Sequence, residues 1–388
     1  MNRPPLRDAA APLVFFTGGT ALRALSRHLA AHAVPAVHIV TTFDSGGSTA
    51  ALRRSFAMPA VGDIRHRLGA LADPGVVPPR VLDIWEWRMP REGNPECLRE
   101  ELRALGEAWH PFWLDVPERF AAPLRQYFCD FLAHMPADFD PCGACFGNLV
   151  IAGGFLRHGR RLDPILAACA RLLAIRGAVV PIVEGSFHLA AELSNGAIRI
   201  GQHCFGDAPR PVRRLFLTVH DPDHGVCEAT PCRPRMVARA AAAIGAAGLL
   251  CYPMGSFYSS VLANLLPEGV GRRIAAADCP KVFIPNSGGD KECPSGTVAG
   301  QAETLLQTLR ADAPDAAVSR LLTHVLVDSR QGRYVGSAET ERLRNLGIRV
   351  IDAAIVMPDE PQRHDPQAVG DLLVSLRDEN RREPLSHA

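Results

Sequence analysis

The chain has 388 residues, of which 47% are hydrophobic and 21% are charged, and its formal net charge is +1. This balance is typical of a globular protein with a large core, and it excludes a largely disordered, collagen-like or coiled-coil chain. The small net charge also argues against a protein built to coat nucleic acid or an anionic membrane surface.

The first part of the chain predicts β-α-β units. Leu13–Phe16 is a short apolar run, the turn Thr17–Thr20 follows it, and apolar residues then recur at helical spacing. A second strand is predicted over Ala36–Thr42, and helix or loop continues to Ala72. Strands that alternate with helices imply a parallel sheet. The predicted fold class is therefore α/β: a doubly wound, Rossmann-like three-layer sandwich with an inserted helical subdomain.

The insert is predicted over residues 83–147 because composition changes there. All four tryptophans lie between Leu82 and Gly147, and acidic residues outnumber arginines from Asp83 to Asp140. The segment is expected to be helical and to serve either for packing or as a lid over the carboxyl edge of the sheet. Residues 1–82 and 148–378 then form the two parts of the α/β core, and residues 379–388 form a flexible tail.

The second part of the chain predicts helices over residues 147–174, followed by a hairpin and further strands. Asn195-Gly196 is a strong hairpin signal, and it lies between the strand candidates Leu189–Leu193 and Ala197–Gly201. The other strand candidates are Val179–Val183, Val212–Val219, Gly248–Cys251, Lys281–Pro285, His324–Val327 and Arg349–Val356.

Familiar nucleotide motifs are absent from the sequence. A G-x-x-x-x-G-K-[ST] loop is missing, which excludes a Walker-type NTPase, and no G-x-G-x-x-G follows a strand, which disfavours a nicotinamide oxidoreductase. The turn Gly18-Gly19-Thr20 stands in that place instead. Glycines let the backbone approach a ligand closely, and the start of the following helix favours a phosphate. A plain strand-to-helix turn is the alternative.

Polar turns follow three further predicted strands. Asp44 and the run Gly46-Gly47-Ser48 follow the second strand, and Gly62–Arg65 adds the carboxylate of Asp63 and the cation of Arg65, unless these form a surface salt bridge. Gly255–Ser260 predicts another anion cradle, whereas Asn286–Asp290 suits a turn and a site equally well. Because ligands of open α/β sheets bind at the carboxyl ends of the strands, these turns predict one shared site.

The cysteines predict reduced thiols. Eleven is an odd number, and Cys142 and Cys145 form a single C-x-x-C pair, for which buried inert thiols are favoured over zinc or redox chemistry. No apolar run approaches the roughly 18 residues of a membrane span. We expect a cytoplasmic protein that binds neither membrane nor nucleic acid.

The ordered motifs resemble those of the CofD family, which contains the 2-phospholactate transferases and the related YvcK gluconeogenesis factors. The matching segments are Gly18–Ala21, Asp44–Ala50, Val61–Arg65, Gly147–Leu149, Gly255–Ser260 and Asn264–Leu266. Ser45 stands where the family has a second aspartate, which puts a two-carboxylate metal site in doubt. Neither the transferases nor the gluconeogenesis factors are expected to have the tryptophan-bearing insert. The chain also resembles the CofD-like proteins of multi-gene bacterial (GAK) systems, which include ATP-grasp enzymes.

The resemblance implies transfer of a phospholactyl group from a nucleoside diphosphate-linked donor to an alcohol acceptor. It implies Asp44, Asp63 and Asn148 as catalytic residues and Asp44 and Asp63 as ligands of Mg²⁺. The phosphate-binding residues that it implies are Gly18, Gly19, Thr20, Gly46, Gly47, Ser48, Arg65, Gly255, Ser256, Tyr258, Ser259 and Asn264. A homodimer is expected. The YvcK relatives imply the alternative, a regulator of carbon or envelope metabolism that binds a nucleotide or nucleotide-sugar without turnover.

Overall fold

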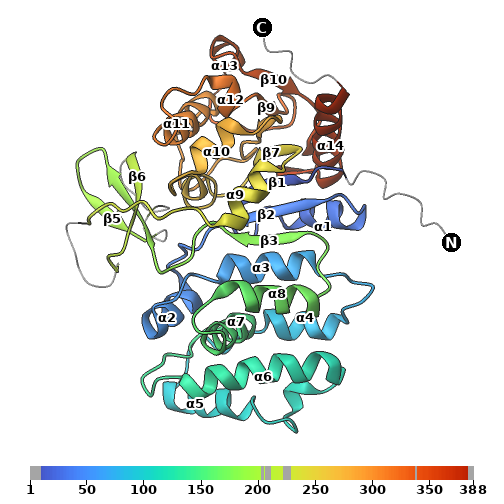
Figure 1. Ribbon diagram of the computed structural model, residues 1–388, viewed down its shortest axis with the longest axis vertical. Helices are drawn as coiled ribbons and strands as arrows, with labels where there is room; N and C mark the ends of the chain where they lie inside the picture. Colours follow the sequence, from blue (N-terminus) through green and yellow to red (C-terminus); the bar gives the residue numbers. More distant parts are fainter. Residues whose placement is uncertain (1–9, 202–204, 206–210, 222–228, 337–338, 383–388) are drawn as a thin grey trace, which may run out of the picture.

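A fully parallel sheet of seven strands lies at the centre of the computed structural model, which describes residues 10–201, 205, 211–221, 229–336 and 339–382 (Figure 1). The strands in spatial order are β10 (Arg349–Asp352), β9 (His324–Val327), β8 (Lys281–Phe283), β7 (Leu249–Tyr252), β1 (Leu13–Thr17), β2 (Ala36–Val40) and β3 (Ala178–Pro181). All five residues of β1 are buried, as expected for a parallel strand that is covered on both faces.

Helices cover both faces of this sheet, which confirms the predicted three-layer α/β fold. On one face, Phe15 of β1 packs with Leu25 of α1 (Arg23–Ala31) and Leu373 of α14 (Pro366–Arg382). On the other face, apolar residues of the strands pack with three helices. These are α9 (Ala238–Gly245), α10 (Val270–Ala276) and α11 (Val298–Arg310). The short helices α12 (Val318–Leu321) and α13 (Thr340–Asn345) complete this layer.

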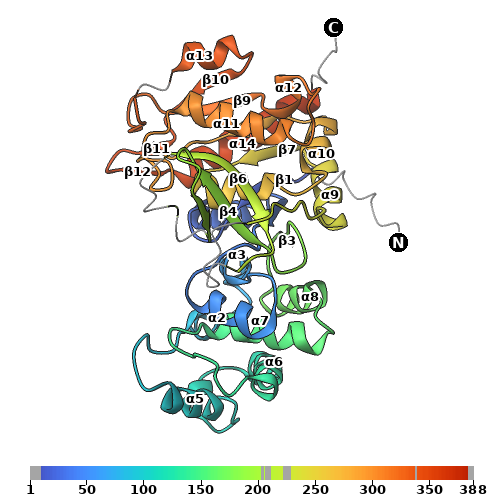
Figure 2. The same cartoon turned by 90° about the vertical axis from the view of Figure 1, so that its left-hand side faces the viewer.

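A helical lobe extends from the β3 side of the sheet (Figures 1 and 2). Its helices are α2 (Gly47–Phe56), α3 (Gly62–Leu71), α4 (Pro79–Glu86), α5 (Pro95–Ala104), η1 (Pro111–Trp113), α6 (Glu118–His134), α7 (Phe146–Arg157) and α8 (Leu162–Leu172). They share one hydrophobic core that includes Trp85, Trp113 and Phe146. The helical part of the chain therefore reaches beyond residues 83–147 on both sides.

A small antiparallel sheet projects beside the core, in the order β5 (Ile198–Ile200), β4 (His188–Leu193), β6 (Val212–Thr218). The hairpin predicted at Asn195-Gly196 is confirmed, and Gly196 has a φ of +83°, which only glycine adopts readily. A second hairpin joins β11 (Val356–Met357) and β12 (Glu360–His364). The strand expected over Arg349–Val356 is thus divided between β10 and β11.

The chain ends differently from the prediction of a tail over residues 379–388. Helix α14 continues to Arg382, so the first four of these residues are helical, and residues 383–388 lie outside the described residues. Within the described ranges, none of the helices combines the length and the apolar character needed to cross a bilayer.

His38 predicts an acid sensitivity of this fold. It is fully buried on β2, stacks on Phe15 with ring centroids 5.2 Å apart, and neither ring nitrogen has a hydrogen-bond partner. Burial, helped by the charge of Arg67, lowers the pKa of His38 well below its ordinary value of 6.5. The unfolded chain therefore binds an extra proton below pH 6.5, and stability that is present above that pH is lost as the pH falls.

We expect His38→Leu to weaken this pH dependence. Between pH 6.5 and 5, one such histidine reduces the free energy of unfolding by up to about 1 kcal/mol per pH unit, and the variant should lack that contribution. Urea unfolding at pH 7.5, 6.0 and 5.0 measures how the free energy of unfolding depends on pH. His32→Gln, at an exposed histidine, is the control and should match the wild type. An unchanged slope in His38→Leu would contradict the prediction.

Candidate functional site

A cavity of about 250 Å³ lies where the order of strands in the parallel sheet reverses. From β1 the chain continues outward through β2 and β3, and it later returns to β7 on the other side of β1. In open α/β sheets such a switch point is where ligands bind. The residues that line the cavity are Phe16, Thr17, Gly18, Gly19, Thr20, Ala21, Gly46, Asp63, Met254, Gly255, Ser256, Ser259, Ser260, Val261 and Glu292.

The glycine turn after β1 is held in place by the buried side chain of Arg67. This guanidinium donates hydrogen bonds to the carbonyl oxygens of Gly18 (3.0 Å) and Gly19 (2.8 Å), and to the hydroxyl of Ser26 (2.7 Å). In a trans peptide the N–H of the next residue points away from the carbonyl. The N–H groups of Gly19 and Thr20 therefore point away from Arg67, and they have no hydrogen-bond partner in the described part of the chain. They are free to bind a ligand oxyanion.

Asp63 brings negative charge to the same cavity from the first turn of α3. Its Oδ2 accepts a hydrogen bond from the hydroxyl of Thr41 at 2.9 Å. Burial and repulsion by Asp44 raise the pKa of Asp63 to about 6, while the charge of Arg67 opposes that rise. Asp44 itself does not line the cavity. Its Oδ1 accepts from the N–H of Gly46 at 2.9 Å, so it lies directly behind the cavity wall.

The close approach of Asp63 explains why the turn contains glycine. A Cβ atom on Gly19 would lie 2.5 Å from Oδ1 of Asp63, and one on Gly18 would collide with the hydroxyl of Ser260.

We expect Gly19→Ala to weaken binding of a diphosphate ligand at least tenfold, measured by titration calorimetry. Gly75→Ala is the control, because Gly75 is exposed, does not line the cavity, and its Cβ would meet only the side chain of Asp73, at 3.3 Å. Equal affinity in the two variants would show that the turn does not contact the ligand.

The opposite wall of the cavity comes from the turn after β7 and the segment after β8. The side chain of Asn286 holds Gly255 by accepting from its N–H (2.9 Å) and donating to its carbonyl oxygen (2.7 Å). Glu292 accepts from the N–H (2.8 Å) and hydroxyl (2.5 Å) of Ser259 and from the N–H of Tyr258 (3.1 Å). The stretch Asn286–Asp290 thus supports the turn after β7.

The anion cradle predicted over Gly255–Ser260 needs a correction, because a carboxylate of the protein occupies part of it. Glu292 takes the donors of Ser259 and Tyr258, and Asp290 accepts from the N–H of Phe257 at 2.6 Å. The Tyr258 side chain lines a different cavity. Of this stretch, Gly255, Ser256 and Ser260 remain as cavity residues with no such carboxylate partner among the described residues.

Several predicted site residues lie outside the cavity and join elements of the fold. Ser48 accepts from the side chain of Asn148 (3.3 Å), and Asn148 in turn accepts from Arg65 (3.4 Å). All three are buried. Asn264 donates to the carbonyl oxygen of Thr17 at 3.2 Å, which ties the segment after β7 to the end of β1. Gly47 is also outside the cavity, and its φ of +49° begins α2.

Sequence reasoning missed Arg67 and Glu292 in this region, and it missed the two hydrogen bonds by which Asn286 holds Gly255. For Arg67 a signal exists, because it follows Asp63 by four residues and therefore shares a helix face with it, whereas Arg65 points elsewhere. Glu292 lies in an irregular segment, where no periodic pattern indicates the direction of a side chain.

The donor set of the site fits a magnesium ion only in part. Asp44 and Asp63 offer carboxylate oxygens close enough to repel each other, and Mg²⁺ usually takes one or two carboxylates and completes its shell with phosphate oxygens and water. In the described ranges, no group of three or more metal-ligating side chains occurs. A bound Mg²⁺ would therefore depend on oxygens that the ligand supplies.

Comparison with known proteins shows the family of this chain. Residues 13–356 match the family described as "2-phospho-L-lactate transferase CofD". The chain belongs to the CofD family. The resemblance found in the sequence motifs is thereby confirmed.

Relatives of this CofD-family chain carry the name gluconeogenesis factor. The protein of Bacillus subtilis is 26% identical over 373 residues, which cover 94% of this chain and 97% of the relative. A putative gluconeogenesis factor of Nostoc is 24% identical and covers 93% of this chain and 68% of the relative. A crystal structure of a UPF0052 family protein from Bacillus halodurans superposes with a TM-score of 0.68 at 23% identity, covering 94% of this chain and 99% of that one. It supports the fold.

Proposed function

We propose that this CofD-family protein transfers a phospholactyl-type group from a nucleoside diphosphate-linked donor to an alcohol acceptor at the switch-point cavity. The observation that carries the proposal is the pair of N–H groups at Gly19 and Thr20, which have no hydrogen-bond partner among the described residues. Arg67 holds their turn by its carbonyl oxygens, and the carboxylate of Asp63 lines the same cavity. Free backbone donors recognise phosphate oxygens, and an acidic residue beside them is what a cation-assisted phosphoryl transfer needs.

In the proposed reaction the acceptor oxygen attacks the phosphorus that carries lactate. The bridging P–O bond breaks, the nucleoside monophosphate leaves with that bridging oxygen, and the hydroxyl proton passes to solvent. The N–H groups of Gly19 and Thr20 hold phosphate oxygens, and positioning of this kind is most of what such catalysis requires. Asp44 and Asp63 would hold Mg²⁺, which supplies neutralisation of the developing phosphate charge.

The experiment that tests the proposal is a calorimetric titration of nucleoside di- and monophosphates, each with and without Mg²⁺. The proposal expects a diphosphate to bind, and to bind at least tenfold more tightly with Mg²⁺. The nucleobase with the highest affinity then selects the lactate-linked donor, and release of nucleoside monophosphate on addition of a deazaflavin alcohol measures turnover. Absence of diphosphate binding under both conditions would contradict the proposal.

A second function, a regulator that binds a nucleotide or nucleotide-sugar without turnover, is favoured by one observation. Relatives aligned along nearly the whole chain are named gluconeogenesis factors, a name that states no reaction. Ser45, where the family has a second aspartate, agrees with this alternative, because binding tolerates the loss of a metal ligand better than catalysis does. It expects metal-independent binding of a nucleotide-sugar and no release of nucleoside monophosphate.

A further inference from the structure

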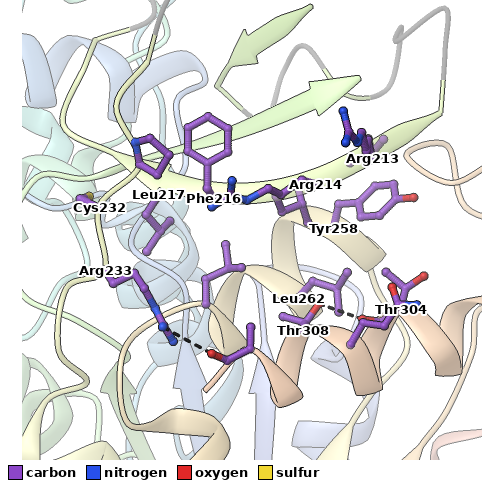
Figure 3. Close-up of a pocket in the computed structure, with 16 residues that line it drawn as sticks. Arg213, Arg214, Phe216, Leu217, Cys232, Arg233, Tyr258, Leu262, Thr304 and Thr308 are labelled. Atoms are coloured by element: carbon purple, nitrogen blue, oxygen red, sulfur yellow. Dashed lines mark hydrogen bonds between the residues drawn. The ribbon is translucent and has the colours of Figure 1, made fainter. Parts of the chain in front are cut away.

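A second cavity, of about 310 Å³, forms a groove between β6 and α11 (Figure 3). One side is the run of consecutive residues Val212–Leu217 of β6, and the other side is α11. Tyr258 and Leu262 lie between them and come from η4 (Phe257–Val261) and η5 (Leu262–Leu265). We call this cavity the β6–α11 groove. The groove and the switch-point cavity share no lining residue.

The groove runs along the free edge of β6. Successive side chains of a strand point to opposite faces, so a cavity lined by every residue from 212 to 217 follows the edge of the strand and not one face. Among the described residues, β6 is the outer strand of its three-stranded sheet, and the strand that pairs with it is β4. At the far end of the edge, the carbonyl oxygen of Leu217 accepts from the N–H of Cys232 at 2.7 Å.

Backbone groups of β6 are therefore open to a further strand. In an antiparallel pair, every second residue directs its N–H and C=O to the same edge. Because Leu217 faces away from β4, Leu215 faces the same way. Regular alternation ends at Arg213, where the ladder with β4 shifts register. Within the described ranges, Leu215 has no backbone partner on that edge. An edge of this kind is a template for pairing with another chain.

The facing helix presents a surface that a strand can lie against. Thr304, Gln307, Thr308 and Ala311 follow the spacing i, i+3, i+4, i+7 and so form one stripe along α11. The stripe is uncharged, and its side chains are small or flexible. Leu217, Leu262 and Leu266 add apolar area beneath it. An extended segment placed here would have backbone partners on one side and side-chain contacts on the other.

The charges of the groove favour an acidic occupant. Three arginines line the groove, and its lining contains no aspartate or glutamate. Arg213 is paired with Glu192 at 2.9 Å and Arg233 with Asp312 at 3.2 Å. Arg214 instead lies over the ring of Phe216, 5.8 Å from the centroid, and it has no ion-pair partner in the described parts of the chain. It is the cation that an acidic side chain would meet.

We propose that the β6–α11 groove binds an extended acidic segment of a partner protein, which adds as a strand to the edge of β6. Main-chain hydrogen bonds to Leu215 supply affinity, and a carboxylate facing Arg214 with apolar side chains on the groove floor supplies selectivity. The groove and the switch-point cavity are lined by different residues, so binding here can be measured separately from the transfer chemistry.

A display library of random heptapeptides, selected against the full-length protein, tests the proposal. Selected peptides should be rich in Asp or Glu and in β-branched residues. Fluorescence anisotropy with a selected peptide should show at least tenfold weaker binding to Arg214→Glu. Arg199→Glu is the matched control, because Arg199 is exposed on the opposite edge strand of the same sheet and does not line the groove. Equal loss in both variants would overturn the proposal.

A backbone-modified peptide separates strand addition from simple charge attraction. N-methylation of alternate amides in the same peptide removes donors without changing its charge, and it should abolish binding. Thr308→Trp, which fills the groove, should weaken binding as strongly as Arg214→Glu. An N-methylated peptide that binds as well as its parent would overturn the proposal, and so would a library without enriched acidic peptides. Binding of decanoate to the groove without any peptide binding would assign it to small amphipathic anions instead.

Discussion

Arg67→Met is expected to lower the free energy of unfolding by about 3 kcal/mol or more and to abolish ligand binding at the switch-point cavity. The guanidinium of Arg67 is fully buried and binds the carbonyl oxygens of Gly18 and Gly19 and the hydroxyls of Ser26 and Thr17. Methionine fills a similar volume but leaves these acceptors unpaired. Loss of one partner from a buried charged network costs several kcal/mol, because the remaining groups stay desolvated.

Two further variants separate charge from geometry at this position. Arg67→Lys keeps the charge near Asp63 but cannot reach four acceptors at once, so it should lose part of the stability and most of the binding. Arg27→Met removes an exposed arginine and should change the unfolding free energy little. Urea unfolding and titration calorimetry measure both properties. A wild-type unfolding midpoint in Arg67→Met would show that this arginine does not hold the turn.

The α/β core could be predicted from the sequence because its strands are continuous apolar runs with glycine-rich turns. β1 is a good example, since LVFFT is buried on both faces and Gly18 follows directly. Parallel strands all direct their carboxyl ends to one edge, so the polar turns that follow them had to meet. This reasoning placed Gly18, Gly19, Thr20, Asp63 and Gly255 in one cavity.

The rest of the site depends on side-chain directions that one turn motif does not specify. The motif Gly62–Arg65 drew attention to Arg65, but α3 directs Arg65 towards Asn148 and brings Arg67 under the glycine turn. Likewise, Ser259 follows a strand as a phosphate-binding serine would, yet Glu292 reaches it from 33 positions further along the chain. The sequence around Ser259 does not predict a contact with a residue so far along the chain.

The extent of the helical lobe also lay beyond a prediction from composition. The tryptophans mark residues 83–147, but the core in which Trp85, Trp87 and Trp113 pack includes Leu52 of α2 and Leu166 of α8. Those helices have ordinary composition, so composition does not indicate that they belong to the helical lobe. The amphipathic pattern indicates a helix but not the neighbour that covers its apolar face.

Asp63→Asn is expected to reduce turnover by about 10²–10⁴-fold, the range typical of a lost catalytic carboxylate. Asn keeps the size of the side chain and can still bond the hydroxyl of Thr41, so the fold should be retained. Without one of the two charges that would hold Mg²⁺, the gain in diphosphate affinity on adding Mg²⁺ should also disappear. Calorimetry with and without the metal measures that gain separately from turnover.

The control for Asp63→Asn is Asp83→Asn, which neutralises an exposed carboxylate on α4 and should leave both quantities unchanged. Asp44→Asn should behave like Asp63→Asn, because the two carboxylates are close enough for Asp44 to raise the pKa of Asp63. If the wild type releases no nucleoside monophosphate while a nucleotide-sugar binds equally to the wild type and to Asp63→Asn without metal, the regulatory function holds instead. If the wild type turns over and Asp63→Asn does so at the same rate, the transfer chemistry stands but Asp63 has no part in it.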